Sequence, residues 1–202
     1  MTFLSDPPLT KQDQVLQAAA RCFVDEGFHG SSMSRIAKAA QMSVGHIYHY
    51  FESKDAIIAE LVRREEARAN ERLDYFESLD SETLFDALIG KVEEGICMST
   101  ELFYSVLVLE ILAEATRNDK IAAIVQEVDI EMRRKFSGIL AGTLGLDAAE
   151  SRVEALFTIF GGLSVRSIRN PHIDTDRLVP IIRAAIRGIL EANIPPDVTQ
   201  QG

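Results

Sequence analysis

Two histidines, His46 and His49, lie three residues apart in a short stretch that begins at Ser43. An imidazole can donate a hydrogen bond to guanine or accept one from adenine, and the nearby glycine, Gly45, lets a backbone approach a base edge closely. Lys54 places a positive charge a few residues further on. These side chains suit contact with DNA better than the interior of a protein.

The same side chains allow two other chemistries, which the sequence supports less well. His46 and His49 could bind a metal ion, but no third ligand lies close to them in the sequence, and a zinc site needs at least three protein ligands. A Ser-His-Asp hydrolase would need a strand-turn-helix elbow for its nucleophile, and no such pattern occurs. We therefore expect no metal site, no cofactor and no enzymatic activity.

Two short amphipathic helices, joined by a turn over residues 41–43, position these groups. Apolar residues recur at i, i+3, i+4 and i+7 in each helix, so each has one face that we expect to be buried. These faces consist of Met33, Ile36, Ala37 and Ala40 in the first helix and of Val44, Ile47, Tyr48 and Phe51 in the second. Ser43 is the expected N-cap of the second helix. A preceding helix over residues 10–26, capped by Thr10 and ended by Gly27, completes a three-helix unit with a helix-turn-helix at its end.

The remainder of the chain predicts only further helices. Six amphipathic or apolar segments follow, at about residues 53–76, 81–96, 100–116, 118–142, 147–168 and 176–192. No strand-like alternation of useful length, internal repeat or low-complexity block occurs. We therefore predict an all-α fold of about nine helices, with a helix-turn-helix domain over residues 10–53 and a helical body over residues 54–192. Residues 1–9 and 193–202 are expected to form flexible tails.

Charge is distributed unevenly between these two parts. The 202-residue chain carries a formal net charge of −10, yet residues 1–54 hold five basic and five acidic side chains, so the body carries the whole excess. DNA would repel the acidic body, and the neutral head could make only a short, oriented contact. One copy of the head should therefore bind DNA weakly, and useful affinity would need two linked copies.

The composition also bounds location and redox chemistry. No segment has the pattern of a signal peptide, and no run reaches the ~18 uninterrupted apolar residues that a membrane span needs, so we expect a cytoplasmic protein without membrane contact. The two cysteines, Cys22 and Cys97, lie far apart within helical patterns. We expect both to be small core side chains that do not form a disulfide.

Residues 27–54 carry a resemblance to a known family. The matching positions are Gly27-Phe28, Ser32-Met33, Ile36-Ala37, Ala40, Met42-Ser43, Gly45, Ile47-Tyr48, Tyr50-Phe51 and Ser53-Lys54. In these positions the chain closely resembles the TetR family of bacterial transcriptional regulators. The match covers about residues 10–60, and beyond them only the helical layout, the length and the acidic body are similar. The resemblance implies an N-terminal DNA-binding domain and a helical C-terminal domain that dimerises and binds a small molecule, which releases the operator.

The resemblance also implies roles for individual residues. The expected base contacts in the major groove are Ser43, Val44, Gly45, His46 and His49. The expected phosphate contacts are Ser32, Tyr48, Tyr50 and Lys54. Many family members have a basic or polar residue where this chain has Val44. The groove contact here would therefore be more apolar, for example with a thymine methyl group.

Ligand-binding and dimerisation residues are less sharply defined by the sequence. Six residues could line a pocket or equally form an ordinary core: Phe103, Leu107, Glu110, Met132, Phe136 and Phe160. Glu110 interrupts a dense apolar segment and could face a cationic ligand, although an ion pair is the simpler interpretation. Six residues of the last two helices could form a four-helix interface between two copies, or again an internal core: Phe157, Gly161, Gly162, Ile182, Ile186 and Ile189.

The sequence thus predicts a homodimeric, ligand-responsive repressor that binds a palindromic operator. Its expected partners are double-stranded operator DNA, an unidentified small-molecule effector and a second copy of the chain. Two alternatives remain open. One is a small-molecule-binding protein with a non-functional reading head, and the other is a DNA-binding adaptor controlled by a protein partner.

Overall fold

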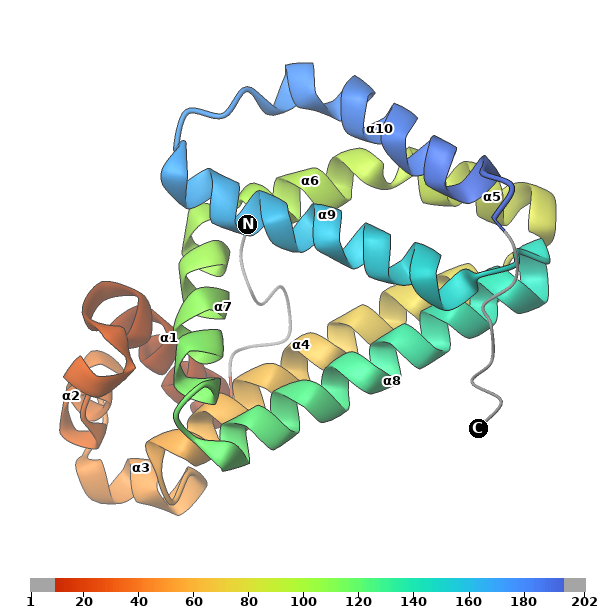
Figure 1. Cartoon of the computed structure of the whole chain (residues 1–202). Coiled ribbons are helices and arrows are strands. Elements are labelled where there is room, and N and C mark those ends of the chain that lie inside the picture. The colour runs from red at the N-terminus through yellow and green to blue at the C-terminus, as the bar shows by residue number, and fades with distance from the viewer. Residues whose placement is uncertain (1–9, 195–202) are drawn as a thin grey trace. The chain divides into compact units, whose positions relative to one another are not determined.

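The computed structural model describes residues 10–194, and every regular element in this range is a helix (Figure 1). The helices are α1 (Lys11–Gly30), α2 (Met33–Ala39), α3 (Val44–Tyr50), α4 (Lys54–Glu77), α5 (Ser81–Gly90), α6 (Val92–Thr100), α7 (Leu102–Ala115), α8 (Asp119–Leu144), α9 (Ala149–Arg169) and α10 (Thr175–Glu191). This confirms the predicted all-α fold. The described range holds ten helices because the helix predicted over residues 81–96 is divided at Lys91, directly after Gly90, a residue type that weakens helices. Residues 1–9 and 195–202, which make up most of the predicted tails, lie outside the described residues.

The chain forms two compact units, each built from more than one stretch of sequence. Of the described residues, the first unit comprises 10–65 together with 106–126, and the second comprises 66–105 together with 127–194. Helices α4, α7 and α8 each contribute residues to both units. The first unit therefore extends beyond the domain predicted over residues 10–53, since it also holds the beginning of α4, most of α7 and the beginning of α8.

In the first unit, α1 packs on α2 and α2 packs on α3 around a buried apolar core. The short helix α3 buries Ile47 fully, and Phe51 is buried directly after it. Val44 and Tyr48 are 36% and 52% exposed, so the expectation that they belong to a buried face is wrong. A helix of two turns places only one row of side chains against the core. Val44 and Tyr48 form a different row, one turn apart.

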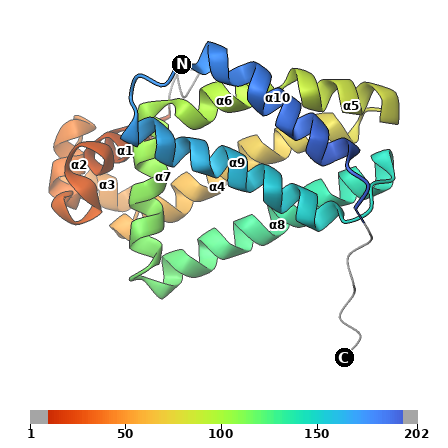
Figure 2. The same ribbon diagram turned by 45° about the horizontal axis from the view of Figure 1, so that its top comes forward.

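In the second unit, α9 and α10 both pack on α6, and Figure 2 shows these helices lying close to one another. Their contact surfaces form a core that includes Val92, Ile96, Val153, Leu156 and Leu190. Gly95 of α6 permits a close approach, because a Cβ at this position would lie 2.7 Å from Cε1 of Phe160. The sequence emphasised a different pair of glycines, Gly161 and Gly162, which are exposed.

Arg152 is a buried charged residue of the second unit, only 3% exposed, and its guanidinium donates several hydrogen bonds to backbone carbonyls. Its Nε donates to the carbonyl oxygen of Asp147 at 2.8 Å, and its Nη2 donates to that of Ala192 at 2.6 Å. Nη1 donates to the carbonyl oxygens of Ile189 and Leu190. The last carbonyls of a helix have no partner within the helix, so Arg152 acts as the cap of α10.

The two cysteines differ in environment. Cys22 is buried in α1, as predicted, but Cys97 is exposed on α6, so the expectation of a core side chain is wrong for Cys97. Val92 and Ile96 of the same helix face the core, and Cys97 follows Ile96 by one residue, a turn of about 100° around the helix axis. Helical spacing alone did not identify which side of α6 is buried.

Candidate nucleic-acid interface

Helix α3 and its N-cap residue together hold all five predicted base contacts on one short, exposed element. Ser43 is its N-cap, and the Ser43 Oγ accepts a hydrogen bond from the backbone N–H of His46 at 3.2 Å. Nothing packs within 4 Å of the place that a Cβ on Gly45 would occupy, so the backbone is open at this point. Because Ile47 anchors α3 in the core, these groups are presented at the surface on a fixed helix.

Tyr50 contacts both histidines of α3. Its Oη lies 3.3 Å from Nε2 of His46, and the two ring centroids are 5.3 Å apart. The ring of His49 meets the same tyrosine edge-on, at 5.2 Å between centroids. Tyr50 thus restricts the orientation of the two imidazoles, a role that the sequence did not predict although the i, i+4 spacing of His46 and Tyr50 was visible.

The beginning of α2 offers a second surface for the same purpose. Ser32 is exposed and is the N-cap of α2, where its Oγ accepts from the backbone N–H of Arg35 at 3.2 Å. The guanidinium of Arg35 forms an ion pair with Glu26 of α1. The charge of Arg35 is therefore partly used within the unit, while Lys38 on the same helix is exposed.

Lys54, a predicted phosphate contact, has partners inside the first unit. Its Nζ donates to the carbonyl oxygen of Phe28 at 2.6 Å and lies 4.1 Å from the centroid of the Phe28 ring. Burial lowers the pKa of Lys54, and the nearby carboxylates of Glu114 and Asp55 oppose this shift. Lys54 therefore links the beginning of α4 to the end of α1, and its contact with phosphate stays a prediction.

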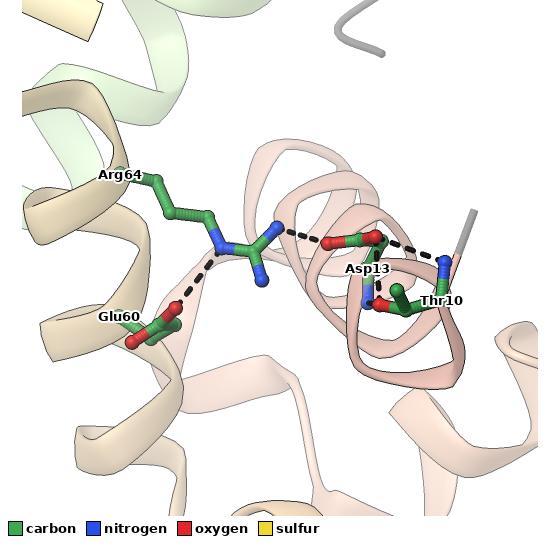
Figure 3. Close-up of polar contacts among 4 residues, drawn as sticks. All are labelled: Thr10, Asp13, Glu60 and Arg64. Atoms are coloured by element: carbon green, nitrogen blue, oxygen red, sulfur yellow. Dashed lines mark hydrogen bonds and ion pairs between the residues drawn. The ribbon is translucent and has the colours of Figure 1, made fainter. Parts of the chain in front are cut away.

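A polar network ties the beginning of α1 to α4 (Figure 3). Thr10 and Asp13 form a capping box, in which the Asp13 N–H donates to Thr10 Oγ1 at 3.1 Å and the Thr10 N–H donates to Asp13 Oδ2 at 2.9 Å. Arg64 Nη1 donates to the other Asp13 oxygen, while Arg64 Nε donates to Glu60 Oε1 at 3.0 Å. Burial raises the pKa of Asp13, but hydrogen bonds from Thr10 and Arg64 outweigh it, so the pKa lies below its ordinary value.

The break in α1 at Gly27 carries a second polar cluster. Gly27 has φ 73° and ψ 164°, a conformation that favours glycine, and it interrupts α1 where the helix was predicted to end, although α1 resumes for one more turn. The Phe28 N–H donates to Glu110 Oε2 at 3.1 Å. The Ser31 hydroxyl donates to the Gly27 carbonyl oxygen at 2.9 Å. Glu110 thus has a partner of a kind that the sequence did not suggest, a backbone amide.

Further contacts of the α7–α8 region lie close to Glu110 in the sequence. Glu114, one turn along α7, is buried, and its Oε2 lies 3.1 Å from Nε2 of the exposed His29. The Asn118 Nδ2 donates to Asp55 Oδ2 of α4 at 3.0 Å. These partners are more than 60 residues apart in the chain, so no local pattern could have paired them.

The six predicted pocket residues are divided between the units. Phe103, Met132, Phe136 and Phe160 belong to the second unit, and Leu107 and Glu110 belong to the first. Phe136 is buried in the second core, where its ring stacks on that of Phe76 at 6.5 Å between centroids. A pocket lined by all six residues stays a prediction.

The second unit also has an open hollow of about 580 Å³ where α5 begins and where α8 and α10 end. It is lined by residues such as Phe85, Leu144, Arg152 and Leu190. None of the predicted pocket residues lines it. The Arg152 guanidinium within it is already engaged by the carbonyl oxygens of α10.

The predicted interface residues also differ in exposure. Gly161 and Gly162 of α9 are exposed, and Phe157, Ile182 and Ile189 are partly buried against the core of the second unit. Ile186 is only 3% exposed, so it packs within that core and offers little surface to a second copy. The outer side of α10 instead presents Ile181, which is 66% exposed.

The described residues were also considered as ligands of a metal ion and as membrane-spanning helices, and they offer neither a metal-binding group nor a single spanning helix. Between residues 10 and 194, no group of three or more His, Cys, Asp or Glu side chains is arranged to hold a metal ion. No single helix in this range has the length and apolar character to cross a membrane. Residues 81–100, which form α5 and α6, reach that length and apolar character only together with residues 102–115 of α7, and the two segments are bent by 69°.

Comparison with protein families identifies the region around α3. Residues 15–61 match the family described as bacterial regulatory proteins, tetR family. The HTH-type transcriptional regulator UidR of Escherichia coli (strain K12) is 34% identical over 114 residues, which are 56% of this chain and 56% of UidR. The chain therefore matches about half the length of this curated relative.

Comparison with solved structures extends the similarity over both units. Salmonella enterica GusR is 26% identical, with a TM-score of 0.70, over 93% of this chain and 98% of GusR. The regulator FadR from Bacillus subtilis, solved in complex with stearoyl-CoA, is 20% identical with a TM-score of 0.67, over 86% of this chain and 96% of FadR. The second likeness concerns the fold alone.

Proposed function

The chain belongs to the tetR family of bacterial regulatory proteins, and on this premise we propose that it is a ligand-responsive transcriptional repressor that binds a palindromic operator as a homodimer. One observation carries the proposal. Helix α3 is capped by Ser43 and anchored by Ile47, and it turns the predicted base-contacting groups outward together. A short helix that is fixed from below and open above suits insertion into a major groove.

The side chains of α3 favour reading of bases over general attraction to phosphate. His46 and His49 offer ring nitrogens to base edges, and the exposed Val44 offers an apolar contact for a thymine methyl group. Residues 1–54 have no net charge, so one head gains little from counterion release. Affinity must then come from specific contacts made twice, which supports a dimer on a two-fold symmetric operator.

The outer side of α10 is the best candidate for the dimer contact. Ile181 is exposed there together with Ala184, Ala185 and Gly188, which are small enough to let a second helix approach closely. On α9 the exposed residues include Gly161, Gly162 and Val165. Two such helices from each copy would form a four-helix interface, with Gly161, Gly162 and the exposed α10 residues at its surface.

Ligand response is supported by the continuity of three helices and by the fold. Each of α4, α7 and α8 has residues in both units, so a change within the second unit can act on the first through these helices. FadR shares the fold and was solved with stearoyl-CoA, which supports a small-molecule effector for a protein of this architecture. Two reading heads must match grooves about 34 Å apart, so a small change in their separation would release the DNA.

The test is selection of an operator from a randomised duplex library by the full-length protein, followed by mobility shifts at defined salt. We expect an enriched sequence with two-fold symmetry, and we expect His49→Ala to change the preferred bases without abolishing binding. A selection that enriches no sequence would favour the alternative of a small-molecule-binding protein with a non-functional head. Native mass spectrometry of the purified protein would then identify a retained ligand.

The salt dependence of binding tests the phosphate contacts separately. Lys54 has three N–H donors, of which one is engaged by Phe28, so the ammonium can still approach a phosphate. We expect Lys54→Ala to weaken binding to all duplexes and to lower the slope of log affinity against log salt by about one. An unchanged slope would assign Lys54 to the fold alone. Lys91→Ala, at an exposed position of the second unit, serves as the matched control and should leave the slope unchanged.

A further inference from the structure

The break in α1 creates a backbone donor that needs an acceptor from elsewhere. In an uninterrupted helix the Phe28 N–H would donate to a carbonyl oxygen four residues earlier, but Gly27 adopts φ 73° and ends that pattern. Phe28 is buried, so an unsatisfied N–H at this position would be costly. The acceptor is Glu110 Oε2, 3.1 Å away and 82 residues later in the chain.

The Glu110 carboxylate accepts the hydrogen bond from the Phe28 N–H and also lies against Gly27, the residue at which α1 is interrupted. A Cβ built on Gly27 would lie 3.4 Å from Glu110 Oε2, which places the carboxylate in contact with the glycine. The carbonyl oxygen of Phe28 accepts a second hydrogen bond, from Lys54 Nζ at 2.6 Å. Phe28 is thus held at its N–H by α7 and at its carbonyl by α4.

The direction in which the chain continues after Phe28 determines where α3, the helix with the predicted base contacts, lies. Only three residues separate Phe28 from Ser32, the N-cap of α2. Ser31 between them is buried, and its N–H donates to the Phe28 carbonyl oxygen at 3.3 Å. Helix α2 packs in turn on α3. A shift at Phe28 therefore displaces Ser32 and, through α2, the groups of α3.

We infer that Glu110 is a positioning residue for DNA binding, which acts through the Phe28 N–H to orient α2 and α3. The inference rests on the proposed function, and it concerns the acceptor oxygen of Glu110 and not its charge. If Glu110 acted only through its charge, its carboxylate would repel DNA phosphate. Removing that charge would then strengthen DNA binding.

Two substitutions separate the reach of the side chain from its charge. Glu110→Gln keeps the length and an oxygen acceptor but loses the charge, whereas Glu110→Asp keeps the charge but withdraws the acceptor from Phe28. We expect Glu110→Gln to bind the selected operator duplex within about threefold of the original protein. We expect Glu110→Asp to lose at least about tenfold in operator affinity, with binding to a random duplex unchanged.

A charge-matched control is Asp25→Asn, which removes one negative charge from an exposed position of α1. Equal operator binding by Glu110→Asp, Glu110→Gln and the original protein overturns the inference, and so does a loss confined to Glu110→Gln. Hydrogen exchange of the Phe28 amide, measured without DNA, decides the case if Glu110→Asp fails to fold. Slow exchange supports the hydrogen bond, and exchange at the rate of an exposed amide overturns it.

The outcome for the original protein keeps this inference apart from the proposed function. If the original protein selects no operator, the proposed function fails and takes the positioning role with it, whatever the variants do. If the original protein binds its operator and both Glu110 variants bind equally well, only the positioning role fails.

Discussion

Each of the two units of this protein has a buried apolar core of its own, but the long-range polar contacts added to that core differ. In the first unit, polar contacts converge on α1: Arg64 and Asp13 join at its beginning, and Glu110 and Lys54 meet Phe28 near its end. In the second unit, α9 and α10 are packed on α6 mainly through apolar side chains. Arg152 is the principal polar addition there, where it caps α10.

The difference suits the task that is proposed for each unit. Hydrogen bonds and ion pairs depend on direction, so they fix the angle at which α1 delivers α2 and α3. Apolar packing depends chiefly on shape and volume, so it tolerates small shifts of one helix against another. Under the proposed function, the first unit reads DNA and needs a fixed orientation, whereas the second unit responds to a ligand and needs room to adjust.

The largest effect on stability is expected where the second unit depends on polar contacts. Arg152→Ala would leave the carbonyl oxygens at the end of α10 without their partner, and we expect a loss of about 3 kcal/mol in the free energy of unfolding. Urea denaturation measures this loss. The exposed Arg187, which pairs with Glu191 one turn away on α10, is the control. Arg187→Ala should cost no more than about 0.5 kcal/mol, and equal losses for both variants would contradict the capping role of Arg152.

Apolar packing in the second unit can be challenged by adding one methyl group. Gly95→Ala would place a Cβ 2.7 Å from Cε1 of Phe160, so either the Phe160 ring or one of the two helices must move. We expect a loss of about 1–3 kcal/mol in thermal or urea unfolding. Gly138 on α8 has nothing within 4 Å of its Cβ position, and Gly138→Ala should stabilise the protein by roughly 0.5–1 kcal/mol. If Gly95→Ala cost no more stability than Gly138→Ala, α6 and α9 would not approach each other as closely as described.

The polar contacts of the first unit should make the free energy of unfolding depend on pH. The pKa of Asp13 is lowered in the folded protein, so its stabilising effect is present above the unfolded pKa of about 3.9 and disappears as pH falls through the folded value. We expect Asp13→Asn to cost about 1–2 kcal/mol near neutral pH, and the difference from the original protein to shrink below about pH 4.

Unfolding measured across acidic pH tests this expectation. Asp86→Asn, at an exposed position of α5, provides a control that should change little at any pH. A cost for Asp13→Asn that stays constant down to the most acidic pH would show that the charge of Asp13 is not what Arg64 recognises.

Local features of the structure were predictable because their physics is local. Thr10, Ser32, Ser43 and Ser53 each accept a backbone N–H at the beginning of a helix, as expected for N-caps. The cap of α5 is Asp80, one residue before the serine that the pattern suggested. Caps and amphipathic spacing involve residues within one or two turns, so sequence alone reveals them.

The side of a short helix that faces the core was harder to predict. Tyr48 has the spacing of a buried residue and is 52% exposed, while Ile47 beside it is fully buried. The spacing of apolar residues fits more than one row of a two-turn helix. Only the position of the neighbouring helices decides which row is covered.

The sequence by itself determined the all-α fold, the caps of the early helices and the groups that α3 carries. Only the tertiary structure decided the partners that lie far away in the chain. Asp13 meets Arg64 across 51 residues of chain, and Phe28 meets Glu110 across 82. The physical reason is that a carboxylate accepts equally well from a guanidinium or from a backbone amide, so its partner depends on which donor the folded helices bring within reach.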